Sequence, residues 1–227
     1  MAKIGYSELQ EFNPWQIFVS LINEDRKIGE FNEARYKHLH PLVENFPLNK
    51  DCILTLRGPR RIGKTTVLKL IIKKLLLQEK ISASQIFYYS LDEVKDFTEL
   101  DEVLRFILEA GREKAKEKRL YLFLDEISFV KEWQRTVKQL ADLGHFQNTT
   151  ILLTGSSSVD LLFSSEQLPG RRGDIIQNDF IYYPLSFCEF VKMVQPKLKT
   201  EEYTPKLLSK LRGLFSDFLL CGVCLGK

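Results

Sequence analysis

A chain of 227 residues is long enough to bury a substantial core in one domain, with room for a small appendage. Its net charge of +3 does not by itself indicate a nucleic-acid-binding protein. The N-terminal sequence lacks the apolar segment of a secretory signal, no apolar run approaches the ~18 residues of a membrane span, and the four cysteines lack a disulfide-like spacing. We therefore expect a cytoplasmic protein without a membrane span.

Residues 1–48 form an N-terminal segment in which two groups of apolar residues flank a polar stretch. The members are Phe12, Trp15, Phe18, Leu21 and Ile22 in the first group, and Tyr36, Leu39, Leu42 and Val43 in the second. Their spacing predicts two helices that pack beside a sheet. For Trp15, and for Trp133 later in the chain, core packing is favoured over stacking on a nucleotide base.

The next segment, residues 49–190, begins with a predicted strand, a glycine-containing loop and a predicted helix. Cys52–Leu56 is a short apolar run typical of a buried strand, and apolar residues recur at helical spacing from Val67 to Leu76. The loop between them fits the pattern G-x-x-x-x-G-K-[ST] without a mismatch. The loop and the threonine after it comprise Gly58, Pro59, Arg60, Arg61, Ile62, Gly63, Lys64, Thr65 and Thr66. Because the pattern lies between a strand and a helix, a phosphate-binding loop is favoured over a solvated glycine turn.

Each residue type in this loop suits a phosphate chain. The two glycines permit backbone angles and a close approach that a side chain would block, and the loop amides can surround an anion at the positive end of the following helix. Lys64 can reach the β- and γ-phosphates, and the Thr65 hydroxyl can complete a Mg²⁺ shell. The Arg60 and Arg61 side chains are not needed for this backbone cradle, so they are free to face solvent, a second domain or a neighbouring subunit, and solvated arginines are favoured.

Strands and helices continue to alternate after the loop. The predicted strands are Ile86–Leu91, Leu120–Leu124 and Thr149–Leu153. A helix is expected to begin at Thr98, with the capping pattern Thr98-Glu99-Leu100-Asp101, and the basic cluster Arg112–Arg119 reads as its solvated face. A second helix is marked by Trp133, Val137, Leu140 and Leu143. The alternation predicts an α/β fold, a parallel sheet with flanking helices.

The strand Leu120–Leu124 ends in an acidic pair, Asp125-Glu126. Ligands of parallel sheets gather at the carboxyl ends of the strands, where the phosphate loop also starts. There Asp125 can hold Mg²⁺ through water, and Glu126 can orient or deprotonate an attacking water. The alternative is an acidic pair that only opens a helix. Downstream of a phosphate loop, the catalytic interpretation is favoured.

Small hydroxyl residues follow the strand Thr149–Leu153. Ser156 can touch the γ-phosphate or the attacking water, and the serines can equally cap a short helix at Val159–Phe163. Both interpretations stay open, and they are compatible if Ser156 faces the nucleotide while Ser158 caps the helix.

Five sequence stretches, taken together, resemble one family. They are GPRRIGKTT, LYLFLDEI, LLTGSSS, LPGRRGD and YYPLSFCEF, in this order. The chain resembles the AAA+-like ATPases of archaea and bacteria, P-loop NTPases close to the signal-transducing NTPase clade, from about residue 13 to its end. The phosphate loop and the acidic pair are common to many NTPases, whereas the last three stretches are far more selective.

The resemblance implies a sheet in which the strand with the acidic pair does not neighbour the phosphate-loop strand. It matches Lys64 and Thr65 to the Walker A residues and the pair Asp125-Glu126 to Walker B. Ser156 is our choice for the sensor-like position. Arg171 is a candidate for reaching a γ-phosphate in its own or an adjacent subunit, unless it or Arg172 only pairs with Asp174 at the surface.

Residues 191–227 are expected to form a short helical extension. Its apolar stripe comprises Leu207, Leu208, Leu211, Leu214, Phe215, Phe218 and Leu219. The resembling family usually continues into a further helical domain, so we expect the chain to lack that domain and the stripe to form an exposed apolar patch. Cys221 and Cys224 have C-x-x-C spacing, but ordinary thiols are favoured over half of a metal site.

The combined expectation is an ATPase: Mg²⁺-dependent attack of water on the γ-phosphate of ATP, coupled to a conformational or assembly change that involves an unknown protein partner or self-association. A small-molecule kinase gains little from Glu126. Two further alternatives are a regulatory switch that holds nucleotide with little turnover, and an ATPase that acts with nucleic acid. The last rests only on basic clusters that lack interleaved aromatic residues.

Overall fold

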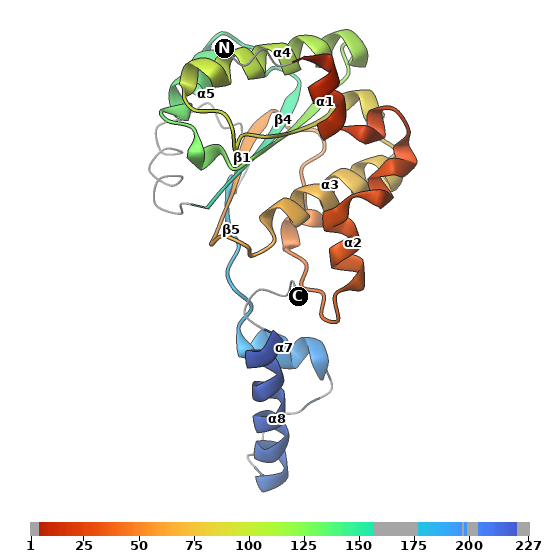
Figure 1. The fold of residues 1–227 in the computed structure, drawn as a ribbon, viewed down its shortest axis with the longest axis vertical. Helices are drawn as coiled ribbons and strands as arrows, with labels where there is room; N and C mark the ends of the chain where they lie inside the picture. The colour runs from red at the N-terminus through yellow and green to blue at the C-terminus, as the bar shows by residue number, and fades with distance from the viewer. Residues whose placement is uncertain (1–4, 157–176, 197, 199–203, 222–227) are drawn as a thin grey trace.

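A computed structural model of the chain describes residues 5–156, 177–196, 198 and 204–221. Its centre is a parallel sheet of five strands with helices on both faces (Figure 1). The strands are β1 (Cys52–Arg57), β2 (Ile86–Ser90), β3 (Leu120–Asp125), β4 (Thr149–Gly155) and β5 (Asp179–Ile181). The predicted α/β fold and the first four strands are confirmed. β5, a half-buried strand of only three residues at the edge of the sheet, was not predicted from the sequence.

The strand order is β2-β3-β4-β1-β5. β4 lies between β1, which leads into the phosphate loop, and β3, which ends in Asp125. The two site-bearing strands are therefore not neighbours, as the resemblance implies. In the parallel register Arg57 pairs with Gly155, and Leu124 pairs with Leu153. The carboxyl ends of β1, β3 and β4 thus meet at one edge of the sheet, where ligands of such sheets bind.

Alternate strand residues enter two separate cores, one on each face of the sheet. Leu54 and Leu56 pack with helix α3 (Lys64–Leu77) and with the N-terminal segment. Ile53 and Ile151 pack with helices α4 (Phe97–Ala115) and α5 (Trp133–Asp142). Because both faces are covered, the first four strands are buried along nearly their whole length and consist mainly of apolar residues, as is usual for parallel sheets. The two tryptophans, Trp15 and Trp133, are buried in these cores, which confirms their packing role.

The prediction of two helices in the N-terminal segment from its apolar groups was wrong. The elements are α1 (Tyr6–Phe12), the 3-10 turns η1 (Pro14–Gln16), η2 (Val19–Glu24) and η3 (Pro41–Val43), and α2 (Arg26–Glu33). The Asn13-Pro14 step ends α1 inside the first apolar group, and Phe18 is extended and exposed. The polar stretch instead forms α2, because the Asp25 side chain accepts hydrogen bonds from the amides of Lys27 and Ile28 and caps that helix.

The predictions for α4 and α5, which cover the sheet face opposite α3, need smaller corrections. The cap of α4 is Asp96 and not Thr98: its carboxylate accepts from the amides of Thr98 and Glu99 at 2.9 and 3.2 Å. At the other end, Lys116 adopts a left-handed conformation that stops the helix, so Arg119 does not lie on its face. α5 is confirmed, but Leu143 follows its last turn and is exposed instead of belonging to the apolar face.

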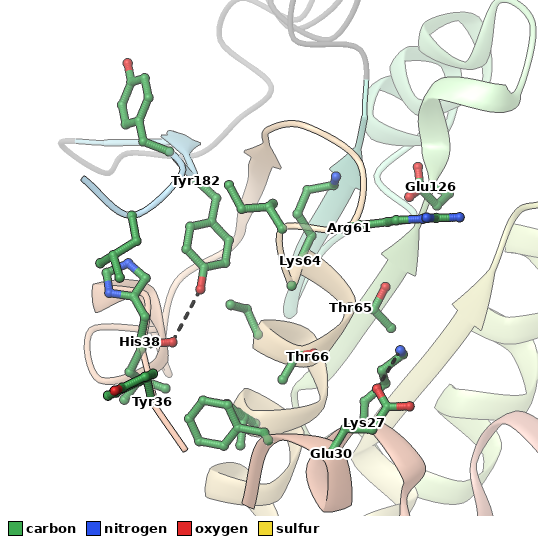
Figure 2. A pocket seen from close by; sticks show the side chains of 18 residues that line it. Lys27, Glu30, Tyr36, His38, Arg61, Lys64, Thr65, Thr66, Glu126 and Tyr182 are labelled. Carbon is green, nitrogen blue, oxygen red and sulfur yellow. Dashed lines mark hydrogen bonds and ion pairs between the residues drawn. The ribbon is translucent and has the colours of Figure 1, made fainter. Parts of the chain in front are cut away.

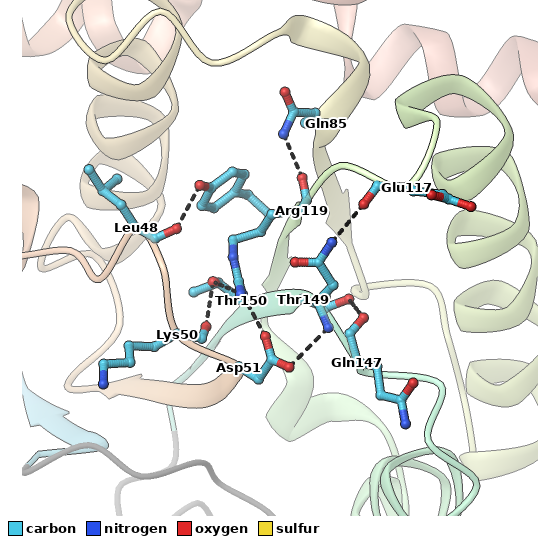
Figure 3. Close-up of polar contacts among 11 residues, drawn as sticks. Leu48, Lys50, Asp51, Gln85, Glu117, Arg119, Gln147, Thr149 and Thr150 are labelled. Atoms are coloured by element: carbon cyan, nitrogen blue, oxygen red, sulfur yellow. Dashed lines mark hydrogen bonds and ion pairs between the residues drawn. The ribbon is translucent and has the colours of Figure 1, made fainter.

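Polar contacts join the amino-terminal ends of the strands, at the edge opposite the carboxyl ends (Figure 3). The Arg119 guanidinium lies 2.7 Å from Asp51 Oδ1 and donates to the Thr150 hydroxyl, which in turn donates to the Lys50 carbonyl. The other oxygen of Asp51 accepts from the Asn148 amide. These contacts tie the starts of β1, β3 and β4 together and leave the opposite edge for a ligand.

Two further helices, α7 (Phe187–Val194) and α8 (Pro205–Cys221), form a small cluster apart from the sheet (Figure 1). α7 begins with a capping box of Ser186 and Glu189. The expected stripe on α8 is partly covered: Leu207 and Leu214 are buried, whereas Leu219 is 61% exposed. Cys224 and the predicted helix at Val159–Phe163 lie outside the described residues. In the described ranges, no helix is long and apolar enough to cross a membrane.

Candidate nucleotide-binding site

The phosphate loop connects β1 to α3 in the conformation that its glycines require. Gly63, directly before α3, has a φ of 105°, in the left-handed region that favours glycine. Gly58 is needed for a different reason: a Cβ there would lie 2.5 Å from the carbonyl oxygen of Tyr182. The loop is thus shaped by one backbone angle and by one close approach from the segment after β5.

Lys64 lies inside this loop. Its side chain is buried, and Nζ donates to the carbonyls of Gly58 and Pro59, both at 2.9 Å. Burial lowers the pKa of the Lys64 ammonium, while the nearby carboxylates of Glu126 and Asp125 act in the opposite direction. An ammonium held among carbonyls and carboxylates in a partly dry site interacts strongly with an incoming phosphate.

Asp125, at the end of β3, is 3% exposed and accepts hydrogen bonds from three hydroxyl groups. The Thr65 hydroxyl donates to Oδ2 at 2.6 Å, the Tyr88 hydroxyl donates to Oδ2 at 3.1 Å, and the Thr154 hydroxyl donates to Oδ1. The carboxylate and the Thr65 hydroxyl provide adjacent hard oxygens, which fit Mg²⁺. Among the described residues, no group of three or more His, Cys, Asp or Glu side chains could hold a metal.

Glu126 has the features of a reactive carboxylate. Its backbone is left-handed, with a φ of 57°, and its amide donates to the Thr154 hydroxyl at 3.1 Å. Among the residues described, its buried Oε2 has no hydrogen-bond partner. Burial raises the pKa of the Glu126 carboxyl, whereas Lys64 and a hydrogen bond with Ser156 lower it. Strained backbone and a shifted pKa in one residue are typical of functional sites.

A single cavity of about 600 Å³ joins the loop to Glu126. Its wall includes residues 61–67 of the loop and α3, together with Glu126 and Tyr182 (Figure 2). On the side away from Glu126, Tyr36 and His38 border it. A cavity of this size and mixed lining suits a nucleotide, with phosphates at the loop and the base towards the aromatic side chains.

The other predicted loop residues are placed as follows. Arg61, Ile62 and Thr66 line the cavity, and Arg61 takes a left-handed backbone angle. The Arg60 guanidinium lies 5.0 Å from the centre of the Phe129 ring, which follows the acidic pair, so it contacts a neighbouring segment of the same chain.

The predicted sensor-like serine has a described position. The Ser156 amide donates to the Ser128 hydroxyl at 3.2 Å, at the end of β4 and beside Glu126. Ser158, Arg171, Arg172 and Asp174 lie outside the described residues, so their predicted roles stay predictions.

Sequence reasoning missed Tyr88 and Tyr182 as site residues, and it did not predict the contact of the Thr154 hydroxyl with Asp125. The Tyr182 amide donates to the Arg57 carbonyl at 2.7 Å, and burial raises the pKa of its phenol to about 12. Tyr88 and Thr154 belong to apolar strands, where a hydroxyl among aliphatic residues gives a weak signal for a buried polar partner.

Known proteins resemble this chain at three levels. A family model described as an AAA domain matches residues 50–191. An uncharacterized protein of Haemophilus influenzae is 30% identical over 193 residues, 82% of this chain and 42% of that protein. The uncharacterized protein MJ1637 of Methanocaldococcus jannaschii is 27% identical over 180 residues, 79% of this chain and 35% of that protein. The chain thus spans about a third to two fifths of the length of these curated relatives.

Solved structures show weaker overall similarity. The structure of Rhizobiales Trip13 matches with a TM-score of 0.47 at 15% identity, covering 92% of this chain and 68% of that one. The Orc1 protein of Aeropyrum pernix, solved in complex with DNA, matches with a TM-score of 0.44 at 12% identity, covering 89% and 58%. The family model covers more than half of the chain, and on that ground the chain belongs to the AAA domain family.

Proposed function

We propose that this chain binds ATP in the cavity beside the phosphate loop and hydrolyses it to ADP and phosphate with Mg²⁺, coupling turnover to a conformational or assembly change. One observation carries the proposal. The same cavity is lined by the loop that would hold the phosphates and by Glu126, whose buried carboxylate oxygen Oε2 lacks a partner among the described residues. A water beside the γ-phosphate would therefore meet a base.

Phosphate binding falls to the loop. Its amides and the positive end of α3 attract the phosphate oxygens, and the Lys64 ammonium lies where the β- and γ-phosphates would enter. As the phosphates bind, Nζ exchanges its contacts with the Gly58 and Pro59 carbonyls for phosphate oxygens.

The metal would be held by the Thr65 hydroxyl directly and by Asp125 through water. Bound Mg²⁺ neutralises charge that develops on the phosphate oxygens during transfer. The hydroxyls of Tyr88 and Thr154 fix the Asp125 carboxylate, so its oxygens already point in one direction before a ligand arrives.

Glu126 would act on the attacking water. Its carboxylate accepts a proton from the water as the oxygen attacks the γ-phosphorus and the bond to the β,γ-bridging oxygen breaks; the ADP oxygen carries the charge away. A pKa raised by burial makes Glu126 a stronger base than an exposed glutamate. Ser156 beside it is proposed to orient the water or the γ-phosphate, and Arg171 to neutralise charge on that phosphate.

Titration calorimetry with ATP tests the binding step. Lys64→Ala should abolish tight binding, because it removes the charge that faces the terminal phosphates. Lys73→Ala, on the same helix but outside the cavity lining, is the matched control and should bind as the unmodified chain does. Equal ATP affinity of the Lys64→Ala variant and the unmodified chain would refute the assignment.

A further inference from the structure

Tyr88 is a buried tyrosine on β2 whose hydroxyl contacts Asp125 from the core of the protein. The residue is 6% exposed, and its hydroxyl donates to the same Asp125 oxygen that the Thr65 hydroxyl contacts. Thr65 is expected to turn towards the metal when a ligand binds. Tyr88 would then remain the donor that holds Oδ2, because its ring is fixed in the core of the sheet.

A buried lysine lies against this ring. Lys69 Nζ is 3.5 Å from the centre of the Tyr88 ring and 5.0 Å from that of Trp15, and 3.4 Å from Asp25 Oδ2. The phosphate-loop pattern does not require a lysine at this position, on the covered face of α3. A charge inside an apolar core costs free energy unless it is paired, so the buried Lys69 ammonium is expected to have a specific role.

Asp25, the partner of Lys69, caps α2. That helix contributes Lys27 and Glu30 to the cavity wall (Figure 2). A line of direct contacts therefore runs from the cavity wall through Asp25, Lys69 and Tyr88 to Asp125. Each contact is sensitive to position: a helix cap, an ion pair, a cation over an aromatic ring and a hydrogen bond to a carboxylate.

The physical effect on Asp125 has two parts. The ammonium over the ring draws electron density from the phenol and makes its hydroxyl a stronger donor, and it fixes the angle of the ring. A carboxylate held in one orientation by such a donor binds a metal better than one that must be ordered on binding, by about 10- to 100-fold in known sites.

We infer that Tyr88 is a positioning residue for Asp125, and that Lys69 with Asp25 acts through Tyr88 to couple the position of α2 to metal binding. The inference rests on the proposed function, since it assigns Asp125 to the metal.

The test is a calorimetric titration of Mg²⁺ into the ADP-loaded chain, at a temperature where every variant is folded. Tyr88→Phe removes only the hydroxyl and should weaken Mg²⁺ affinity about tenfold, without changing ADP affinity in EDTA. Tyr89→Phe is the matched control: the neighbouring tyrosine also donates to a carboxylate, Glu8 at 2.6 Å, away from the cavity. That variant should keep the Mg²⁺ affinity of the unmodified chain. A purely structural role of Tyr88 would lower the melting temperature and leave Mg²⁺ affinity unchanged, which would overturn the inference.

A second variant tests the coupling. Lys69→Met combined with Asp25→Asn removes both charges while keeping side-chain size and a helix-capping amide. In the chain that keeps Tyr88, this pair of substitutions should weaken Mg²⁺ affinity. In the Tyr88→Phe background the same pair should cause no further loss of Mg²⁺ affinity, because the effects of residues that act through one another are not additive. Additive losses would overturn the coupling through Tyr88.

The two proposals fail in different ways. If the unmodified chain does not bind ADP in EDTA, the nucleotide site falls and the positioning role falls with it. If it binds ADP and Mg²⁺ but Tyr88→Phe leaves Mg²⁺ affinity unchanged, only the positioning role is lost.

Discussion

Glu126, the proposed general base, is the residue whose burial bears most directly on the proposed chemistry. Its carboxyl combines a raised pKa, a left-handed backbone angle and a buried oxygen without a hydrogen-bond partner among the residues described. Each feature costs stability, and together they are typical of a site whose strain serves a reaction. Glu126 also lies next to Asp125 on the chain, yet the two differ: Asp125 accepts three hydroxyl hydrogen bonds and is suited to hold a metal.

The raised pKa of Glu126 predicts a pH dependence. A general base must be ionised, so kcat/KM for ATP should rise with pH through the pKa of the free protein. Because burial raises that pKa, the acid limb should lie above the ordinary glutamate value of 4.5. A pH profile of the unmodified chain and of Glu126→Gln checks this. If the unmodified chain and Glu126→Gln show the same acid limb, the titrating group is not Glu126 and the prediction is wrong.

The close approach at Gly58 leads to a second prediction, on the free energy of unfolding. Gly58→Ala places a Cβ 2.5 Å from the Tyr182 carbonyl oxygen, so the loop or the segment after β5 must move. We expect the free energy of unfolding to fall by about 1–3 kcal/mol.

Gly29→Ala, in α2, is the control, because a Cβ there has no atom of the described chain within 4 Å. It should stabilise the protein by up to about 1 kcal/mol. Urea unfolding of both variants measures the difference. Similar effects of the two substitutions would contradict the close approach at Gly58.

At the scale of elements, the cap of α4 can be tested directly. Asp96→Ala removes the acceptor of two amide hydrogen bonds and should lower the free energy of unfolding by about 1 kcal/mol. Thr98→Ala, at the position that the sequence pattern favoured, should change it by less than about 0.5 kcal/mol. Thermal or urea unfolding separates the two, and a larger loss for Thr98→Ala would restore the sequence-based cap.

The elements also show what the sequence could reveal. β1, β3 and β4 were predictable because strands covered on both faces are buried along nearly their whole length and carry a run of apolar residues at their centre. The N-terminal segment misled the same reasoning. Its apolar residues have helical spacing, but the Asn13-Pro14 step breaks the helix, and the Asp25 cap starts one in the polar stretch instead. In this segment the helix cap at Asp25 and the helix-breaking proline determined where helices begin and end, whereas the spacing of apolar residues indicated only which side chains are buried.

The site was partly predictable for a related reason. The chain supplies Lys64 and Thr65 after one strand and Asp125 and Glu126 after another, and a parallel sheet brings these ends together. The contacts of Tyr88 and Tyr182 could not be predicted, since they depend on strand order and on which face each side chain takes. Tyr182 reaches the loop only because β5 pairs with β1 at the edge of the sheet.

At the scale of the whole molecule, the cavity lies where the separate parts of the chain meet. Tyr182, Tyr183 and Leu185, which border it, belong to the segment that leads into α7. Tyr36 also borders it, and its ring contacts Phe190 of α7 edge to face, with 5.0 Å between ring centres. A nucleotide in the cavity would touch both the phosphate loop with α3 and the segment that leads into α7, which supports the proposed coupling of turnover to a change in conformation.

Phosphate release under single-turnover conditions tests the central claim, ATP hydrolysis at this cavity, most directly. With the chain in excess over ATP and Mg²⁺ present, the unmodified chain should convert bound ATP to ADP and phosphate. Glu126→Gln should bind ATP with the same affinity and release phosphate on the order of 10²-fold more slowly, because it lacks the base. An exposed glutamate outside the cavity, changed as Glu132→Gln, should leave the rate unchanged. No phosphate release by the unmodified chain, or an equal rate for Glu126→Gln, would contradict the account.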